Sequence, residues 1–177
     1  EINAHAFHRL EKYNRTLSGR TGCGLCGVEK LEHAIKTLPK VNSHLTVKPS
    51  IIHQTMNALK SKQHLNKETG ALHAAAFSDH NGNIIALRED VGRHNALDKL
   101  IGHMIREKID PALGFALITS RCSFEMVQKC AIVGIPIVVA VSATTGLAVS
   151  LAEQSGISLI AFARKEGLNI VSDTENR

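Results

Sequence analysis

Aromatic residues are scarce in this sequence: its 177 residues include five Phe, one Tyr and no Trp. Proteins that bind single-stranded nucleic acids stack bases on aromatic side chains set among basic residues, and the chain has too few aromatics for that. We therefore expect no nucleic-acid partner, although the net charge of +5 indicates an anionic ligand. The core must be built from Ala, Val, Ile and Leu.

Long apolar runs and cysteines are also scarce. No run approaches the roughly 20 residues of a membrane span, and the first residues, EINAHAFHRL, do not form the apolar stretch of a signal peptide. Four Cys are too few for a secreted disulfide scaffold of this size. We expect a cytoplasmic protein without a membrane partner. Because the chain does not begin with Met, we also expect a fragment or a processed form.

The hydrophobic pattern divides the chain into an irregular N-terminal extension, residues 1–48, and an α/β domain, residues 49–177. In the second part, apolar runs of strand length alternate with amphipathic runs of helix length, which predicts right-handed crossovers and a mixed, mostly parallel sheet. The expected elements are a helix at 51–65 with Ser50 as N-cap, a hairpin at 71–90 turning at Asn81-Gly82, helices at 91–108, 123–134 and 144–156, strands at 114–120, 135–142 and 157–164, and an edge strand at 168–172.

Two cysteines stand three residues apart in a glycine-rich stretch, SGRTGCGLCGVEK. Its free amide groups and nearby cations would lower the pKa of a thiol. The residue types leave four interpretations open: a zinc site, a thioredoxin-like redox pair, an inert or disulfide-bonded loop, and a sulfur nucleophile. Zinc needs two more ligands at suitable spacing, and no strand pattern precedes Cys23 as a redox pair would require. The sulfur nucleophile is therefore favoured, with Cys23 and Cys26 as a reactive and an assisting thiol.

Polar and cationic residues follow three expected strands at the point where each ends. Ligands of open parallel sheets bind beyond the carboxyl ends of strands, and helix N-termini accept anions. We therefore expect one crevice for a phosphorylated ligand. A purely structural interpretation stays open for each stretch, with Asp90 as a helix cap and the cations in solvent. The candidates are Arg93 and His94, Ser120 and Arg121, and Arg164 and Lys165.

The order hairpin, helix, strand, helix is also that of zinc nucleoside deaminases. Those enzymes place His-x-Glu at one helix start and Pro-Cys-x-x-Cys at the next. Here the first position reads His94-Asn95-Ala96, without the Glu, and the second holds Cys122 alone. We expect the deaminase topology without zinc and without deamination.

The stretches GRTGCGLCGVE, LHAAAF, REDVGRHNALDKLIG, TSRCSFEMVQK and VSATTGLAVSLAE closely resemble, in this order, the FdhD family. The resemblance covers nearly the whole chain from about Gly19 to Ser172. Members of this family are sulfurtransferase accessory proteins required for formate dehydrogenase activity. The resemblance implies a cytidine-deaminase-like, three-layer α/β/α fold without the zinc site, and a further N-terminal region that this sequence does not include.

The resemblance also implies a reaction. The chain would carry persulfide sulfur from a cysteine desulfurase to the bis-molybdopterin guanine dinucleotide cofactor (Mo-bis-MGD). Cys23 matches the persulfide-bearing position of the family, and Cys26 matches its second loop cysteine. Two alternatives are kept: a non-catalytic chaperone for the cofactor, and a thiol-disulfide oxidoreductase that uses both cysteines.

The implied partners are the desulfurase, formate dehydrogenase and a second copy of the chain, and a guanine nucleotide would mimic the cofactor. The sequence departs from the family after the Phe of the guanine-dinucleotide site, where Arg164-Lys165-Glu166-Gly167 replaces a glycine-containing turn. No metal ligand is implied. The cofactor-binding residues expected from the resemblance are Ile160, Ala161, Phe162, Ala163, Arg164 and Lys165, with Arg93, His94, Ser120 and Arg121 beside them.

Overall fold

The computed structural model describes residues 38–164 and 167–173. They belong to a compact unit that begins at Leu38. Residues 38–48, which the pattern assigned to the irregular extension, therefore contribute to the α/β unit: Val41 and Val47 are buried, and the Val41 N–H donates to the Ser155 carbonyl at 2.8 Å. The predicted Cys-x-x-Cys loop, with Cys23 and Cys26, lies outside the described residues, as does Lys165.

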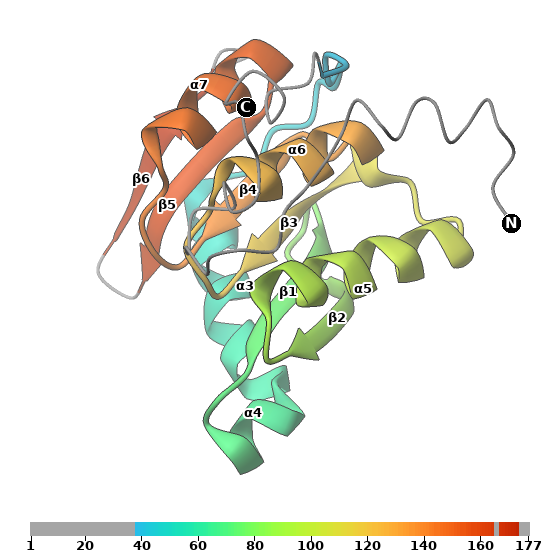
Figure 1. Ribbon diagram of the computed structural model, residues 1–177, viewed down its shortest axis with the longest axis vertical. Helices are drawn as coiled ribbons and strands as arrows, with labels where there is room; N and C mark the ends of the chain where they lie inside the picture. The colour runs from blue at the N-terminus through green and yellow to red at the C-terminus, as the bar shows by residue number, and fades with distance from the viewer. Residues whose placement is uncertain (1–37, 165–166, 174–177) are drawn as a thin grey trace, which may run out of the picture. The chain divides into compact units, whose positions relative to one another are not determined.

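A six-stranded sheet in the order β2-β1-β3-β4-β5-β6 forms the middle of the unit (Figure 1). Strands β2, β3, β4 and β5 run in one direction, and β1 and β6 run against them. The expected α/β class with a mixed sheet is confirmed. Most strands share a direction, as predicted, but only two of the five neighbouring pairs are parallel, because a hairpin closes each side of the sheet. The strands are β1 (His73–Asp79), β2 (Ile84–Asp90), β3 (Gly114–Ile118), β4 (Ile137–Ala140), β5 (Ser158–Arg164) and β6 (Gly167–Ser172).

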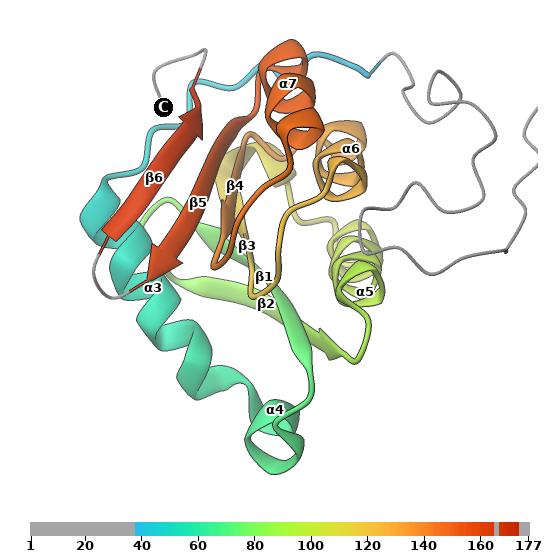
Figure 2. The ribbon, with the colours of Figure 1, turned by 60° about the vertical axis from the view of Figure 1, so that its left-hand side comes forward.

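Helices cover both faces of this sheet, which gives the three expected layers (Figure 2). Helix α3 (Pro49–Lys62) packs on one face, and α5 (Arg93–Arg106), α6 (Phe124–Val133) and α7 (Gly146–Ser155) pack on the other. Between α3 and the sheet, Ile52 and Leu59 meet Phe115 and Leu117 in an apolar cluster. Because β3 is central and covered on both faces, all five of its residues are buried.

The first hairpin turns where the sequence predicts, but only one of the two expected residues has a positive φ. Gly82 has a φ of 88°, whereas Asn81 does not lie in the left-handed region. The Asp79 carboxylate stabilises the turn instead, because its Oδ1 accepts from the backbone N–H groups of Asn81 and Asn83 at 2.9 and 2.8 Å.

The predicted N-cap at Ser50 is wrong. Helix α3 has Lys48 at its N-cap and Pro49 in the first helical position, where the fixed φ of proline suits a helix and its missing N–H is not needed. The predicted helix at 51–65 is also divided: α3 ends at Lys62, and a short helix α4 (His64–Thr69) follows and ends at the left-handed Gly70. Glycines end two later helices as expected, Gly134 after α6 and Gly156 after α7.

Candidate functional site

The carboxyl ends of β2, β3, β4 and β5 lie along one side of the sheet, which we call the carboxyl edge (Figures 1 and 2). The expected site residues within the described ranges lie on this edge, but they are spread along it. Neighbouring strands are about 4.8 Å apart, so β2 and β5, four spacings apart, are separated by about 19 Å. A single small anion cannot contact the whole set, whereas a long ligand can. The set comprises Arg93 and His94 after β2, Ser120 and Arg121 after β3, and residues 160–164 of β5.

Backbone hydrogen bonds join the loops of this edge to one another. Cys122 and Thr144 form an isolated parallel bridge, in which the Cys122 N–H donates to the Ala143 carbonyl at 3.1 Å and the Thr145 N–H donates to the Cys122 carbonyl at 3.2 Å. The Phe162 N–H donates to the Ser142 carbonyl at 3.3 Å. The loops after β3 and β4 therefore extend the sheet by a further rung.

Phe162 is the unusual residue of the predicted guanine-dinucleotide segment. Its φ is 52°, in the left-handed region that non-glycine residues rarely adopt, and the pairing of β5 with β6 shifts register between Ala161 and Arg164. Ile160, Ala161 and Ala163 are buried, but Phe162 is 44% exposed. The irregularity therefore turns one aromatic ring outward at the carboxyl edge, while its neighbours stay in the core.

Arg164, at the end of the same strand, is exposed. Its Nε donates to the Val141 carbonyl at 3.0 Å, which anchors the guanidinium beside the loop that follows β4. Within the described part of the chain, no acceptor is found for its two terminal amino groups. Arg164 is thus held in place and can still bind an anion from solvent.

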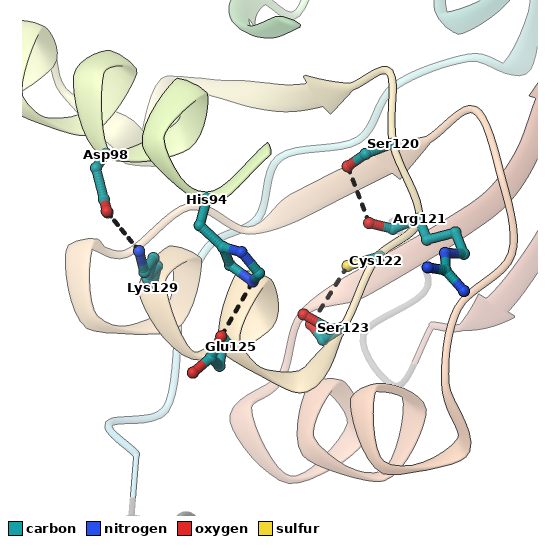
Figure 3. A network of polar contacts seen from close by, with 8 residues as sticks. All are labelled: His94, Asp98, Ser120, Arg121, Cys122, Ser123, Glu125 and Lys129. Atoms are coloured by element: carbon teal, nitrogen blue, oxygen red, sulfur yellow. Dashed lines mark hydrogen bonds and ion pairs between the residues drawn. The ribbon is translucent and has the colours of Figure 1, made fainter. Parts of the chain in front are cut away.

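His94 contacts a residue that the sequence analysis did not select. Its Nε2 lies 3.0 Å from Oε2 of Glu125, at the start of α6; Figure 3 shows the two side chains turned toward each other. Burial lowers the pKa of His94, and the charges of Arg93 and Lys129 lower it further, while Glu125 and Asp98 oppose the shift. His94 therefore joins the starts of two helices. The sequence signal that could have indicated Glu125 is an acidic residue in the first turn of the predicted helix at 123–134.

The two carboxylates of REDVGRH have structural partners. Asp90 Oδ1 accepts from the Gly92 N–H at 2.9 Å and from the Asn95 amide at 3.3 Å, and its other oxygen pairs with Lys99. Lys99 first, and then these donors, lower the pKa of Asp90 to about 2. Glu89 binds the start of α4. The contacts of Asp90 support the structural interpretation, in which it holds the start of the helix.

Ser120 and Arg121 follow β3 directly. Ser120 is buried, and its hydroxyl donates to the Arg121 carbonyl at 2.9 Å, so it shapes the loop. Arg121 is exposed, and its guanidinium points away from the His94–Glu125 pair (Figure 3). Ser123 holds the predicted N-cap position of α6, but its side chain makes no capping bond. Arg121 is therefore the member of this loop that can meet a ligand.

Cys122 and Cys130 are both buried and form no disulfide. Burial raises the pKa of the Cys122 thiol, and the nearby Cys130 adds to the shift; burial raises the pKa of Cys130 to about 12. A thiol reacts as its thiolate, so burial disfavours the reactive form of both side chains in the folded protein.

Residues 38–164 and 167–173 contain no group of three His, Cys, Asp or Glu side chains that could hold a metal ion. The same residues include no helix that is long and apolar enough to cross a membrane. A hollow of about 380 Å³ lies at the C-terminal ends of α5 and α6, away from the carboxyl edge. Ile101, Met104 and Ile132 are among the residues that line it. Its lining is apolar, so it does not suit a phosphorylated ligand.

Comparisons with known proteins agree on one family. The profile described as the FdhD/NarQ family matches residues 1–177. A protein of Bordetella petrii named sulfur carrier protein FdhD is 46% identical over 99% of this chain and 63% of its own length. The protein of that name from Xanthomonas euvesicatoria pv. vesicatoria is 48% identical over 93% of this chain and 58% of its own length. The chain thus spans about three fifths of the length of these relatives.

A solved structure is similar as well. The crystal structure of a putative formate dehydrogenase accessory protein from Desulfotalea psychrophila superposes with a TM-score of 0.70 and 29% sequence identity. The match covers 78% of this chain and 58% of that one. The expected fold is therefore found in a solved structure.

Proposed function

Because this chain belongs to the FdhD/NarQ family, we propose that it is a sulfurtransferase that carries persulfide sulfur from a cysteine desulfurase to Mo-bis-MGD for formate dehydrogenase. The observation that carries the proposal is the state of the cysteines. Of the four, Cys122 and Cys130 are buried with raised pKa values. Cys23 and Cys26 are the two thiols that remain for sulfur chemistry.

Cys23 is the proposed carrier. Its thiolate attacks the outer sulfur of the donor's persulfide; a new S–S bond forms on Cys23, the donor's S–S bond breaks, and the donor cysteine leaves as a thiolate. One sulfur atom moves and no outside oxidant is needed. Arg20 and Lys30, close by in the sequence, favour the thiolate form, and Cys26 supplies a second thiol within the loop.

The carboxyl edge has the chemistry that a long nucleotide cofactor requires. Mo-bis-MGD is cargo here, and it offers phosphates and guanine rings at separate points. Arg121 and Arg164 present exposed guanidinium groups, which pair well with phosphates. Phe162 exposes a ring on which a base can stack, and Arg93 begins a helix whose N-terminus favours anions. The spread of about 19 Å suits a ligand of this length.

Sulfur loading tests the first half of the proposal. After incubation with a cysteine desulfurase and cysteine, mass spectrometry of the intact chain should show an increase by the mass of one sulfur atom. The increase should be lost in Cys23→Ala and kept in Cys130→Ala, which removes a buried thiol. If the chain instead holds one zinc ion per copy and never gains sulfur, the non-catalytic chaperone is the better description. A reversible Cys23–Cys26 disulfide without sulfur gain would favour the oxidoreductase.

Guanine-nucleotide binding tests the second half. Isothermal titration with guanosine diphosphate should give a weaker complex for Arg121→Ala and for Arg164→Ala, because each loses a charge-assisted contact worth about 1.5–3 kcal/mol. Arg106→Ala is the matched control, since this exposed arginine lies at the C-terminal end of α5, away from the carboxyl edge. Equal affinities in all three variants would contradict the assignment of the carboxyl edge.

Three further parts of the proposal concern the surroundings of the reaction. We propose that the protein works in the cytoplasm, as a homodimer, and with formate dehydrogenase as its client. Sedimentation of the purified chain tests the dimer, and restoration of formate dehydrogenase activity in cells that lack the native accessory protein tests the client.

A further inference from the structure

The end of α3 and the whole of α4 carry exposed lysines, and we call this segment the lysine platform. It consists of Lys60, Lys62 and Lys67, with Leu65 among them. All four side chains are exposed, and Leu65 is 53% exposed. It is the one large apolar side chain of the segment from Lys60 to Gly70.

The platform is held firmly although it buries little. Helix α4 has six residues and none of them is buried, and a helix this short is not stable alone. The Glu89 carboxylate accepts from the backbone N–H groups of Leu65 and Asn66 at 3.0 and 2.9 Å, and the Asn66 side chain accepts from the Leu72 N–H at 2.9 Å. These bonds fix the orientation of α4 without giving it a role in the core.

Nearby acids balance the charge of the platform only in part. Within residues 38–164 and 167–173, Lys60, Lys62 and Lys67 take part in no ion pair. Two acids lie among them, Glu68 in α4 and Glu89, whose carboxylate is bonded to the α4 backbone, so the three lysines leave a net positive charge of one. Two other lysines are paired, Lys99 with Asp90 and Lys129 with Asp98, whereas Lys40, Lys48 and Lys108 also take part in none of the ion pairs of the described residues. The unpaired charges can therefore attract a partner from solvent.

The platform lies beside the carboxyl edge. Glu89, which holds α4, is the neighbour of Asp90 at the end of β2, and Leu72 leads into β1, whose first residue pairs with Asp90. Figures 1 and 2 both show α4 projecting beyond the end of β2, on the side where the candidate site lies. A protein that takes a ligand from the carboxyl edge must approach this region.

We propose that the lysine platform is a docking surface for an acidic patch on the enzyme that receives the cofactor, and that Leu65 enters an apolar hollow within this patch. The proposal rests on the proposed function, because it takes the cofactor-receiving enzyme as the partner. A single exposed leucine is too little for a membrane-bound amphipathic helix. The segment also lacks the Phe, Tyr and Trp rings that single-stranded nucleic acids use. An acidic protein surface is the partner that the composition favours.

Electrostatic docking of this kind acts mainly on the rate of association and weakens with salt. The test measures binding of the full chain to immobilised formate dehydrogenase that lacks sulfurated cofactor, by surface interferometry at several salt concentrations. The platform variant carries Lys60→Glu, Lys62→Glu and Lys67→Glu together. The matched control carries Lys40→Glu, Lys48→Glu and Lys108→Glu, which change the net charge equally at exposed positions outside the platform.

The platform variant should associate at least about tenfold more slowly at low salt, while the control changes much less. Leu65→Ser should speed dissociation and leave association nearly unchanged. Urea midpoints and guanosine diphosphate affinities of both charge variants should match the parent, which excludes unfolding and damage to the candidate site. If the charge reversal disturbs the end of α3, replacement of the three lysines by Gln removes their positive charges without adding negative ones.

Equal slowing in the platform and control variants would overturn the proposal, because net charge alone would then explain the binding. Unchanged association in the platform variant would also overturn it. The proposal would also be overturned if the platform variant bound anionic phospholipid vesicles or single-stranded RNA more weakly than the parent while its binding to the enzyme stayed the same. If the parent chain loads sulfur and binds guanosine diphosphate but does not bind the enzyme, this inference fails and the proposed function stands. Loss of sulfur loading itself is the failure of the proposed function.

Discussion

Substitutions at Phe162 can separate backbone strain from ligand contact. The residue has a φ of 52°, a conformation that costs a residue with a Cβ about 1 kcal/mol or more. Phe162→Gly and Phe162→Ala both remove the half-buried ring, so each variant should lose about 2 kcal/mol of packing free energy. Glycine alone also removes the strain. We expect Phe162→Gly to unfold with a free energy about 1 kcal/mol above that of Phe162→Ala, which reverses the order of these residues at ordinary strand positions.

Urea unfolding at equilibrium measures this difference, and titration with guanosine diphosphate measures the ligand contact. Stacking on an aromatic side chain contributes about 1–3 kcal/mol per base, so both variants should bind roughly 5- to 150-fold more weakly, and to the same extent. Leu113→Ala is the control, since this residue is 65% exposed and precedes β3 at the opposite edge. A more stable alanine variant would refute the left-handed backbone, and unchanged affinity would refute the stacking.

Four other predictions concern stability and reactivity. Gly102→Ala adds a Cβ with no atom within 4 Å and should raise the free energy of unfolding by about 0.5–1 kcal/mol. Gly114→Ala drives its Cβ into the Ser78 carbonyl oxygen of β1 and should lower the free energy of unfolding by about 3 kcal/mol or more; urea midpoints check both. Burial lowers the pKa of His94, so the unfolded chain takes up a proton before the folded one and stability falls as the pH drops below about 6.5. His94→Gln should therefore lose less stability between about pH 7 and pH 5 in thermal melts, and an unchanged loss would contradict this. In a variant without the two loop cysteines, Cys122 and Cys130 should react with a thiol reagent only after urea unfolds the chain, and fast native reaction would contradict their burial.

Much of the fold could be predicted because its signals are local. The apolar strand runs, Gly82 in the hairpin turn and Gly134 and Gly156 after their helices each depend on a few neighbouring residues. The predicted N-cap at Ser50 failed because Pro49, one residue earlier, already suits the first helical position. The helical pattern gave no sign of the division between α3 and α4, and Glu89, which binds the start of α4, is distant in sequence.

The candidate site was only partly predictable. Arg121 and Arg164 were placed on one edge because parallel strands end on the same side. The partners of single side chains required the tertiary structure: the three donors that hold Asp90 at the start of the helix were not predicted, and Glu125 was not selected. No residue pattern indicates the left-handed φ of Phe162, since phenylalanine rarely adopts it.

The rung formed by Cys122 and Thr144 has a consequence for the energetics of recognition. Loops that are free to move must be ordered when a ligand arrives, and that loss of freedom subtracts from affinity. Here the amides of Cys122 and Thr145 are already fixed, so their hydrogen exchange should be nearly as slow as that of β3 and β4. A ligand reaching Arg121 would meet a surface whose shape exists before binding.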